Sequence, residues 1–334
     1  MINFSCTRAR NYRQVQRQLM GRITRHLPDG SWTTTRRTYV EGALNFTFFV
    51  DFEADVLMSH GAADKNYHWR RTEDGTEYLN NVQRRTDLLV PGPFLRERIV
   101  ASDVLDLDAE HVHSVGWPRL DLLIRRQDAR RRAEREQPAL QRWRQRRRRK
   151  RVLWAPTHDW VRRSTPVSSY PDFLPYVERL EQYFDVSVSL HPRNRRTNTP
   201  TRAPLLDADV VITDFGTMLY EGWVLGKQVI FPDWIIGEAM AYHCPRSSEN
   251  KIFRERLGLH PDNFEAMMDM IEQGTGLDER AVAHRDHYLD PLHHKHSGKR
   301  IADLLLAMDA ERNGAVHPEA PTAHPAADTA RDNQ

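Results

Sequence analysis

Hydrophobic and polar positions follow a regular order between residues 152 and 233. The apolar run VLWA at 152–155 leads into a proline-containing loop, apolar residues recur at helical spacing over 173–184, and DVSVSL at 185–190 alternates as a strand does. After a polar loop, ADVVITDFGTMLYEGWVLGKQVIFPD at 208–233 gives a buried strand, a turn of small polar residues, a helix and another strand. This alternation predicts a parallel sheet with helices on its faces.

The first half of the chain repeats the pattern less regularly. A strand at 55–58 runs into a His-Gly turn, TDLLVPGPFLRERI at 86–99 gives strand, turn and helix, and EHVHSVGWPRLDLL at 110–123 gives a further strand ending at glycine and proline. These elements predict a second, smaller α/β domain. The pattern does not assign residues 1–45.

The expected domain organisation follows from these patterns and from composition. We expect an N-terminal α/β domain at 1–124, a basic linker or helix at 125–151, a C-terminal α/β domain at 152–311 and a tail at 312–334. The apolar spacing of the stretches NFEAMMDMIEQG and SGKRIADLLLAMD predicts two helices late in the C-terminal domain. The tail is rich in Ala and Pro with little to bury, so we expect it to be disordered.

Composition is that of a water-soluble protein. Charged residues make up 28% and hydrophobic residues 39% of the 334, and no apolar run approaches the roughly 18 to 20 residues of a membrane helix. The first residues show no apolar signal region, and the two cysteines form no CxxC motif. We therefore expect a reducing, cytoplasmic setting.

Positive charge is concentrated in one segment. Residues 125–151 hold fourteen Lys/Arg and three acids, a local charge of +11, whereas the rest of the chain carries −8. The ordinary explanation is a solvated helical linker. A functional explanation is attraction to an anionic membrane surface or a polyanionic acceptor. A nucleic-acid partner uses the same charge but is less favoured, because Trp143 is the only aromatic residue available for base stacking.

Three loops leave strands of the C-terminal sheet in the same direction, at Pro156, His191 and Thr213. Loops at the carboxyl ends of parallel strands converge on a ligand crevice. His191 and Arg193, in LHPR, offer an imidazole and a guanidinium to anionic oxygens, so they are candidate phosphate ligands; ordinary surface charge is the alternative for Arg193.

The turn from Thr213 to Thr217 is a candidate phosphate site. Free N–H groups at the start of the following helix attract anions, Gly216 permits close approach, and the hydroxyls of Thr213 and Thr217 can donate. The alternative is ordinary capping, in which Asp214 or Thr217 satisfies the same N–H groups. Glu221 lies one turn further along and could accept from a ribose hydroxyl, although a helix-surface carboxylate is the commoner explanation.

Five motifs, in order, resemble one family. They are HGAADK at 60–65, VGWPRLDLL at 115–123, VLWAPTHD at 152–159, LHPR at 190–193 and the stretch at 208–233. Together, over residues 55–305, they resemble the CDP-glycerol glycerophosphotransferases, which include teichoic-acid and capsule-type polymerases and primases. The family's usual His-Gly-Thr-Pro-Leu-Lys keeps only His60, Gly61 and Lys65, and its usual Thr-Asp-Tyr-Ser-Ser turn is Thr-Asp-Phe-Gly-Thr.

The resemblance implies a GT-B-like α/β fold, in which two Rossmann-like domains face a central cleft. It implies transfer of an alditol phosphate from CDP-glycerol or a related CDP-alditol to a hydroxyl of a polyanionic or lipid-linked acceptor, with release of CMP. His60 is the candidate base, because an imidazole with a pKa near 6.5 accepts a proton around neutral pH. Such an enzyme is expected in the cytoplasm, peripheral to the inner face of the cell membrane.

Other candidate contacts to nucleotide or acceptor are Gly61 and Lys65 in the His-Gly loop, Arg119 from the opposite domain, and Lys299 and Arg300 in SGKR. The histidines at 284–296 match no zinc pattern, so no metal site is predicted. No Walker-type loop or GxGxxG occurs, so no ATP or NAD cofactor is predicted, and the need for a divalent cation is left open.

Two alternatives stay open. A GT-B glycosyltransferase of envelope polysaccharide synthesis would use the same cleft with a nucleotide sugar. A nucleic-acid-binding protein would instead use the arginine-rich run at 125–151.

Overall fold

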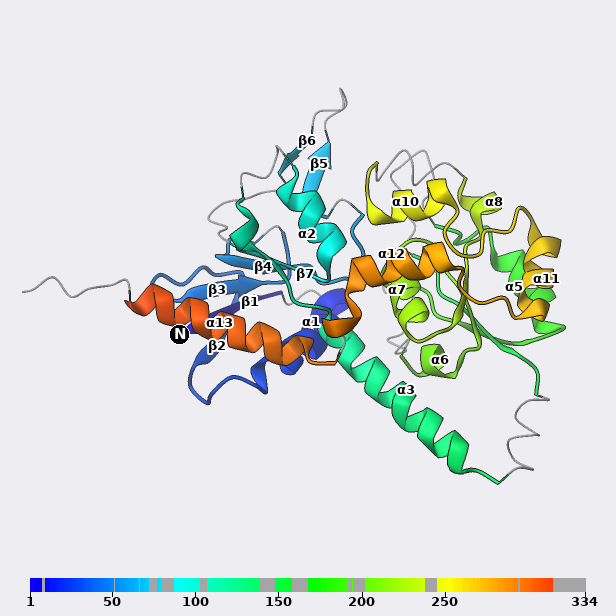
Figure 1. Ribbon diagram of the computed structural model, residues 1–334, viewed down its shortest axis with the longest axis horizontal. Coiled ribbons are helices and arrows are strands. Elements are labelled where there is room, and N and C mark those ends of the chain that lie inside the picture. The colour runs from blue at the N-terminus through cyan, green and yellow to red at the C-terminus, as the bar shows by residue number, and fades with distance from the viewer. Residues whose placement is uncertain are drawn as a thin grey trace, which may run out of the picture.

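Two parallel β-sheets lie side by side, each flanked by helices (Figure 1). The computed structural model describes residues 1–7, 10–50, 52–65, 67–71, 77–79, 87–102, 107–138, 148–157, 168–191, 194, 202–237, 245–293 and 295–314.

The N-terminal sheet has six strands in the order β2-β1-β3-β4-β7-β8, all paired in parallel. They are β1 (Ile2–Cys6), β2 (Trp32–Arg36), β3 (Leu44–Thr47), β4 (Val56–Met58), β7 (Asp87–Val90) and β8 (Val112–Ser114). A separate antiparallel pair joins β5 (Trp69–Arg71) to β6 (Glu77–Leu79).

The unassigned residues 1–45 supply one edge of this sheet and the strand next to it. They form β1, α1 (Arg10–Thr24), β2 and the start of β3, and β1 lies between β2 and β3. The polar residues of β1 hide the strand from a hydrophobicity pattern, yet Asn3 is fully buried. Its amide donates to Asn45 Oδ1 at 2.8 Å and to the Thr38 carbonyl at 3.0 Å. A buried amide that is hydrogen-bonded in this way costs little, so the strand stays inside.

The C-terminal sheet has the order β10-β9-β11-β12, again parallel, and confirms the parallel sheet expected for 152–233. Its strands are β9 (Arg151–Trp154), β10 (Asp185–Val188), β11 (Val210–Ile212) and β12 (Gln228–Ile230). Its helices are α5 (Leu174–Glu181), α6 (Arg202–Asp207), α7 (Thr217–Val224), α8 (Asp233–Ile236), α10 (Ser248–Glu255), α11 (Phe264–Gln273) and α12 (Glu279–Leu289). The sequence pattern did not predict α6.

The two faces of this sheet belong to different cores. Val152 and Trp154 of β9 pack in a cluster with residues of α5 and α11, whereas Leu153 and Ala155 belong to a larger cluster that continues into the N-terminal sheet. Alternation along a strand produces this division. The two sheets are therefore joined through shared apolar packing as well as through the chain.

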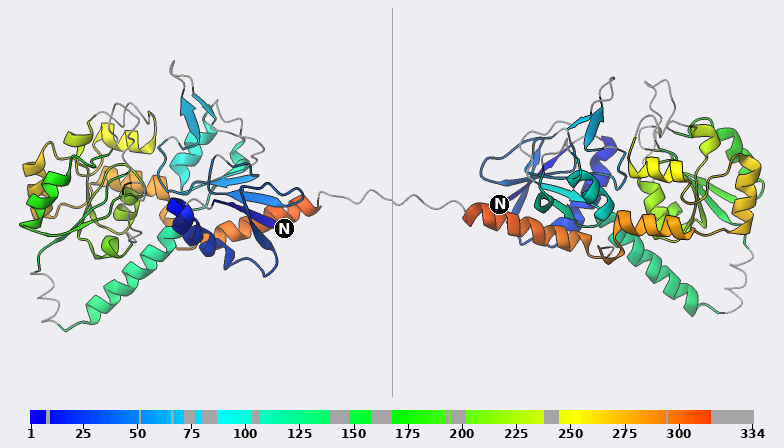
Figure 2. Two further views of the ribbon diagram at one scale, coloured as in Figure 1. Left: turned by 180° about the vertical axis from the view of Figure 1, so that it is seen from behind. Right: turned by 45° about the horizontal axis from the view of Figure 1, so that its top comes forward.

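Four helices pack with the N-terminal sheet: α1, α2 (Pro93–Val100), α3 (Pro118–Glu136) and α13 (Ser297–Gly314). The placement of α13 corrects the expected domain boundary, because this last helix contacts α1, β1 and β3 and does not join the C-terminal sheet. Figure 2 shows α12 beside one unit and α13 beside the other. The Asp121 carboxylate of α3 holds the start of α13 in this position, since it accepts hydrogen bonds from the N–H groups of Ser297 at 3.2 Å and Gly298 at 3.1 Å.

The basic segment begins as helix. One continuous helix, α3, crosses the expected boundary at 124/125, and residues 139–147 lie outside the described residues. The tail was expected from residue 312, which is three residues too early, because α13 continues to Gly314. Residues 315–334 also lie outside the described part. No helix in the described chain has the length and apolar character needed to cross a membrane.

Candidate active site between the two sheets

His60 follows β4 directly and stands in an aromatic corner. The Phe49 ring stacks on the imidazole at 5.3 Å between centroids with an interplanar angle of 19°, and the rings of Tyr12 and Tyr67 meet it edge-on at 5.1 and 5.5 Å. The imidazole is half-buried. Packing on several sides limits the ring's freedom, so a proton-accepting nitrogen would be held in a fixed direction.

The turn after β11 leads into α7 without a side-chain cap. Gly216 occupies the N-cap position, and no side chain there bonds to the first N–H groups of the helix. Asp214 does not cap it either: its carboxylate accepts from the Thr157 N–H at 2.8 Å, the Ser169 N–H at 3.1 Å and the Ser168 hydroxyl at 3.1 Å. The helix start therefore keeps the donors that an anion needs.

Asp214 instead ties together two loops at the carboxyl end of the sheet. Burial raises the pKa of Asp214, and the hydrogen bonds from Ser169, Thr157 and Ser168 act in the opposite direction. The Asp214 carboxylate is therefore directed toward these donors and does not act as the predicted alternative cap of α7.

The His60 turn and the α7 turn meet across the two sheets. The Ala62 N–H donates to Thr217 Oγ1 at 3.0 Å, and a β-carbon added to Gly61 would lie 3.0 Å from the same oxygen. Lys65 Nζ donates to Thr157 Oγ1 at 3.0 Å and lies 3.6 Å from the position of a β-carbon on Gly216. The loop that carries the candidate base, the Lys65 ammonium and an uncapped helix start are thus neighbours, although about 155 residues separate the loop from the helix in the chain.

A buried acid holds the His60 loop in this place. Glu249 of α10 accepts from the Asp64 N–H at 3.0 Å and from the Lys65 N–H at 2.7 Å. Burial, together with the nearby Asp64 carboxylate, raises the pKa of Glu249. On the other side, the Tyr288 hydroxyl donates to the Ala62 carbonyl at 2.5 Å. The loop is therefore hydrogen-bonded to three elements of the C-terminal unit.

The hydrogen bonds around the His60 loop continue from Asp64 to Arg98 and, through Ser248, to His284. Asp64 pairs with Arg98 at 2.5 Å and accepts from the Ser248 N–H at 3.0 Å. Ser248 Oγ lies 2.9 Å from His284 Nε2, and burial lowers the pKa of His284 to about 4. That imidazole is neutral at pH 7. The Arg98–Asp64 pair at the interface between the units is therefore hydrogen-bonded to a neutral Ser–His pair.

Arg119 and Glu221 pair with each other between the units. The burial of Glu221 argues against its predicted ribose contact, whereas the ligand contact of Arg119 stays a prediction. Arg119 Nε lies 2.8 Å from Glu221 Oε1, and the Glu221 side chain is 0% exposed. Burial raises the pKa of Glu221, and the charge of Arg119 opposes that rise. Glu221 has no exposed surface for a ribose hydroxyl, so the pair joins the start of α3 to α7.

Three further candidates have protein partners in place of the predicted phosphate contacts: Thr213, Lys299 and Arg300. The Thr213 hydroxyl is buried and donates to the Ala155 carbonyl at 2.7 Å, which binds one strand exit to its neighbour. Lys299 is exposed and pairs with Asp303 at 2.6 Å, and Arg300 donates to the Val115 carbonyl at 2.9 Å. SGKR begins α13, which packs on the N-terminal unit.

Of the two candidate phosphate ligands in LHPR, the structure describes His191 but not Arg193. His191 follows β10, the edge strand next to β9, and is half-buried; its role as a phosphate ligand stays a prediction. Arg193 lies outside the described residues. Among the described residues, no group of three or more His, Cys, Asp or Glu side chains is placed to hold a metal ion.

Sequence reasoning missed Thr157, Glu249 and Tyr288. Thr157 follows the first strand exit, and its position in APTHD was a usable signal. Glu249 and Tyr288 had no local signal, because their partners are about 185 and 226 residues away.

Three solved structures of the wall teichoic acid polymerase TagF resemble this chain over nearly its whole length. TagF itself aligns with a TM-score of 0.59 at 14% identity over 95% of this chain and 90% of that one. A histidine-to-alanine variant gives 0.59 at 15% over 93% and 90%. A histidine-to-asparagine variant soaked with CDPG gives 0.59 at 14% over 94% and 89%.

No protein-family model and no curated protein sequence matches the chain. At these identities the likeness concerns the fold. It confirms the GT-B-like arrangement of two α/β units that the sequence motifs predicted, and the chain therefore has the fold of TagF.

Proposed function

We propose that this protein is a cell-envelope transferase that moves an alditol phosphate from a CDP-alditol, with CDP-glycerol as the leading donor, to an acceptor hydroxyl. The observation that carries the proposal is the contact between the His60 loop and the α7 turn. The His60 loop carries a candidate base and the Lys65 ammonium, and the α7 turn carries uncapped N–H donors. The fold shared with TagF agrees with this assignment.

The reaction needs a base, charge stabilisation and alignment. The acceptor oxygen forms a bond to the β-phosphorus, and the bond from that phosphorus to the bridging oxygen breaks. CMP leaves with the electron pair, and His60 accepts the hydroxyl proton. Gly216 and Thr217 supply donors to the pyrophosphate oxygens, and Lys65 neutralises charge beside them.

His60 and the α7 turn come from different sheets, so both units must contribute to one reaction centre. Glu249 and Tyr288 act as positioning residues in this proposal, because they bond to the backbone of the loop that carries His60 and Lys65. The acceptor is a polyanionic or lipid-linked hydroxyl compound. We further propose that the enzyme works at the inner membrane surface, since the basic α3 segment would be attracted to anionic headgroups.

A donor panel tests the proposal. The purified protein is given CDP-glycerol, CDP-ribitol and several UDP-sugars with a glycerol-phosphate primer, and nucleotide release is measured by chromatography. We expect CMP from a CDP-alditol, dependent on the primer. UDP release from a UDP-sugar without any CMP would contradict the proposal and support the nucleotide-sugar alternative.

A further inference from the structure

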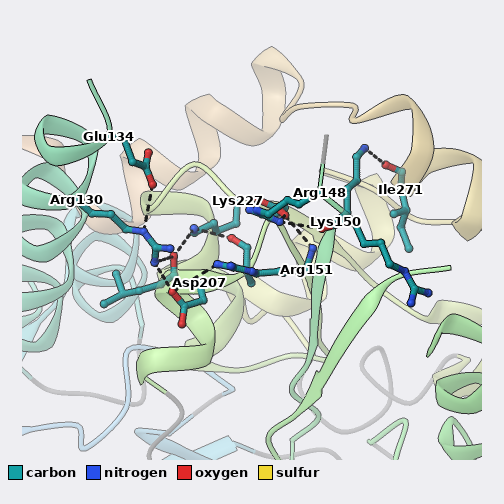
Figure 3. A network of polar contacts seen from close by, with 12 residues as sticks. Arg130, Glu134, Arg148, Lys150, Arg151, Asp207, Lys227 and Ile271 are labelled. Atoms are coloured by element: carbon teal, nitrogen blue, oxygen red, sulfur yellow. Dashed lines mark hydrogen bonds and ion pairs between the residues drawn. The ribbon is translucent and has the colours of Figure 1, made fainter. Parts of the chain in front are cut away.

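A basic hollow lies at the amino-terminal end of the C-terminal sheet, away from the candidate active site. It has a volume of about 640 Å³ and lies between α3, α6 and the first residues of β9. Figure 3 shows the charged side chains that gather there. Arg151 begins β9, whereas the loop carrying Thr157 follows the other end of the same strand, so the sheet separates the two sites.

One face of α3 forms a wall of the hollow. Gln127, Arg130, Arg131, Glu134 and Arg135 line it, at intervals of three and four residues. This spacing places them on the same side of a helix. The exposed arginines Arg126 and Arg132 do not line the hollow.

Carboxylates neutralise only part of this charge. Asp209 accepts from both terminal nitrogens of Arg148, at 2.6 and 2.8 Å, and Asp207 lies 2.5 Å from Arg130. Arg130 also meets Glu134 at 3.2 Å. The lining holds seven Lys/Arg and three acids, which leaves a local charge of +4.

The excess positive charge belongs to side chains that form no ion pair with a carboxylate among the described residues. Arg131 and Arg135 are exposed, and within the described chain neither has an ion pair. Lys150 donates to the carbonyls of Ile271 and Glu272, which close α11, so its charge also lacks a carboxylate there.

Lys227 places a partly buried ammonium against the same hollow. It donates to the carbonyls of Leu206 at 3.0 Å and Ala208 at 2.7 Å. Burial, followed by the charge of Arg130, lowers the pKa of Lys227 to about 8, Arg131 acts in the same direction, and Asp209 and Asp207 oppose them. An anion in the hollow would relieve this repulsion.

We propose that this hollow is a second anion site, which binds the phosphate group of a multiply charged ligand. Guanidinium and ammonium donors converge on it, and such donors suit phosphate oxygens. Among the described residues that line the hollow, Leu206 and Ala208 are the only apolar side chains, and none of them is aromatic. The lining thus favours a compact phosphate over an acyl chain or a stacked base. The inference does not depend on the proposed transfer reaction.

The test compares two pairs of charge reversals on α3. Arg131→Glu with Arg135→Glu alters the face in the hollow, and Arg126→Glu with Arg132→Glu changes the net charge equally outside it. Pyrophosphate binding is measured by calorimetry. We expect the first pair to weaken binding about tenfold or more and the matched pair to weaken it about twofold. Pyrophosphate bound elsewhere, including the active site, is common to all three proteins and cancels in the comparison.

Vesicles of phosphatidylglycerol and phosphatidylcholine identify the source of the phosphate. Co-sedimentation that pyrophosphate reverses points to a lipid headgroup, and pyrophosphate binding without co-sedimentation points to a soluble phosphate compound. Either result supports the site if it depends on Arg131 and Arg135. Equal losses in both pairs, no binding in the unmodified protein, or binding of a single-stranded oligonucleotide alone would overturn it.

Discussion

The two ends of the C-terminal sheet use charge in opposite ways. At the carboxyl end, ionisable groups between the units are buried and matched, as in Arg98 with Asp64 and Arg119 with Glu221. At the amino end, the hollow collects cations that exceed their carboxylates by four. Matched, buried charge fixes geometry, whereas surplus, accessible charge attracts a partner. The net charge of +3 for the whole chain conceals this division.

The largest expected effect is at the carboxyl end. His60→Ala removes the proposed base, so CMP release from the preferred donor should fall by about 10²- to 10⁴-fold. Circular dichroism and thermal unfolding check that the variant remains folded. His26→Ala, which alters an exposed histidine of the N-terminal unit, serves as the control and should keep full turnover. Turnover retained in His60→Ala would exclude His60 as the base.

The second effect concerns the matched charges. Arg119→Ala leaves the Glu221 carboxylate buried without its cation, so the free energy of unfolding should drop by about 3 kcal/mol in urea titrations. Because burial already raises the pKa of Glu221, loss of Arg119 raises it further. The free energy of unfolding of the variant then falls as pH rises from the pKa of Glu221 in the unfolded chain toward its raised pKa in the folded protein. The destabilisation caused by Arg119→Ala should therefore be larger at pH 8 than at pH 5.

Two variants control this experiment. Adding Glu221→Gln to Arg119→Ala removes the stranded charge and should restore part of the stability and abolish the added pH dependence. Lys299→Ala breaks an exposed pair with Asp303, in which both side chains are more than half exposed, and should cost less than about 1 kcal/mol. Equal costs for Arg119→Ala and Lys299→Ala would show that burial of the pair does not matter.

The smallest expected effect is at the amino end. Sulfate keeps its charge between pH 7 and 9.5, whereas Lys227, with a pKa of about 8, loses its proton over this range. Anion binding favours the protonated lysine, so sulfate affinity should weaken about severalfold as pH rises through that range. Lys227→Arg keeps a charged group and should flatten the pH profile. An unchanged profile in the unmodified protein would remove Lys227 from the anion site.

Local features of the sequence predicted the turns that follow the strands. The His-Gly turn after β4 and the Gly216 turn after β11 were visible because short apolar runs and turn residues are local signals. Their contact could be anticipated only through the family resemblance. The inner strand β1 was missed because Asn3 and Ser5 interrupt its hydrophobic pattern, and burial of Asn3 depends on a distant partner, Asn45.

Glu221 shows a signal that was available but not used. Its helix also carries Leu219, Tyr220 and Trp223, all fully buried, and a helix that is apolar around most of its circumference lies inside a protein. A carboxylate in such a helix needs a buried partner, which argues against a ribose contact. The Glu249 contacts had no comparable signal, because both of its backbone partners lie in another unit.

The return of α13 to the N-terminal sheet has a consequence for the order in which the chain folds. Ile301 and Leu305 are fully buried in the core that includes Leu19 and Ile23 of α1. During synthesis, the N-terminal sheet emerges first but lacks this cover until α13 follows, and α13 begins 161 residues after the end of α3. The C-terminal sheet receives all of its strands earlier. The unit that is synthesised first is therefore completed last, and a ribosome-bound chain that stops before residue 297 exposes the apolar groove in which α13 normally lies.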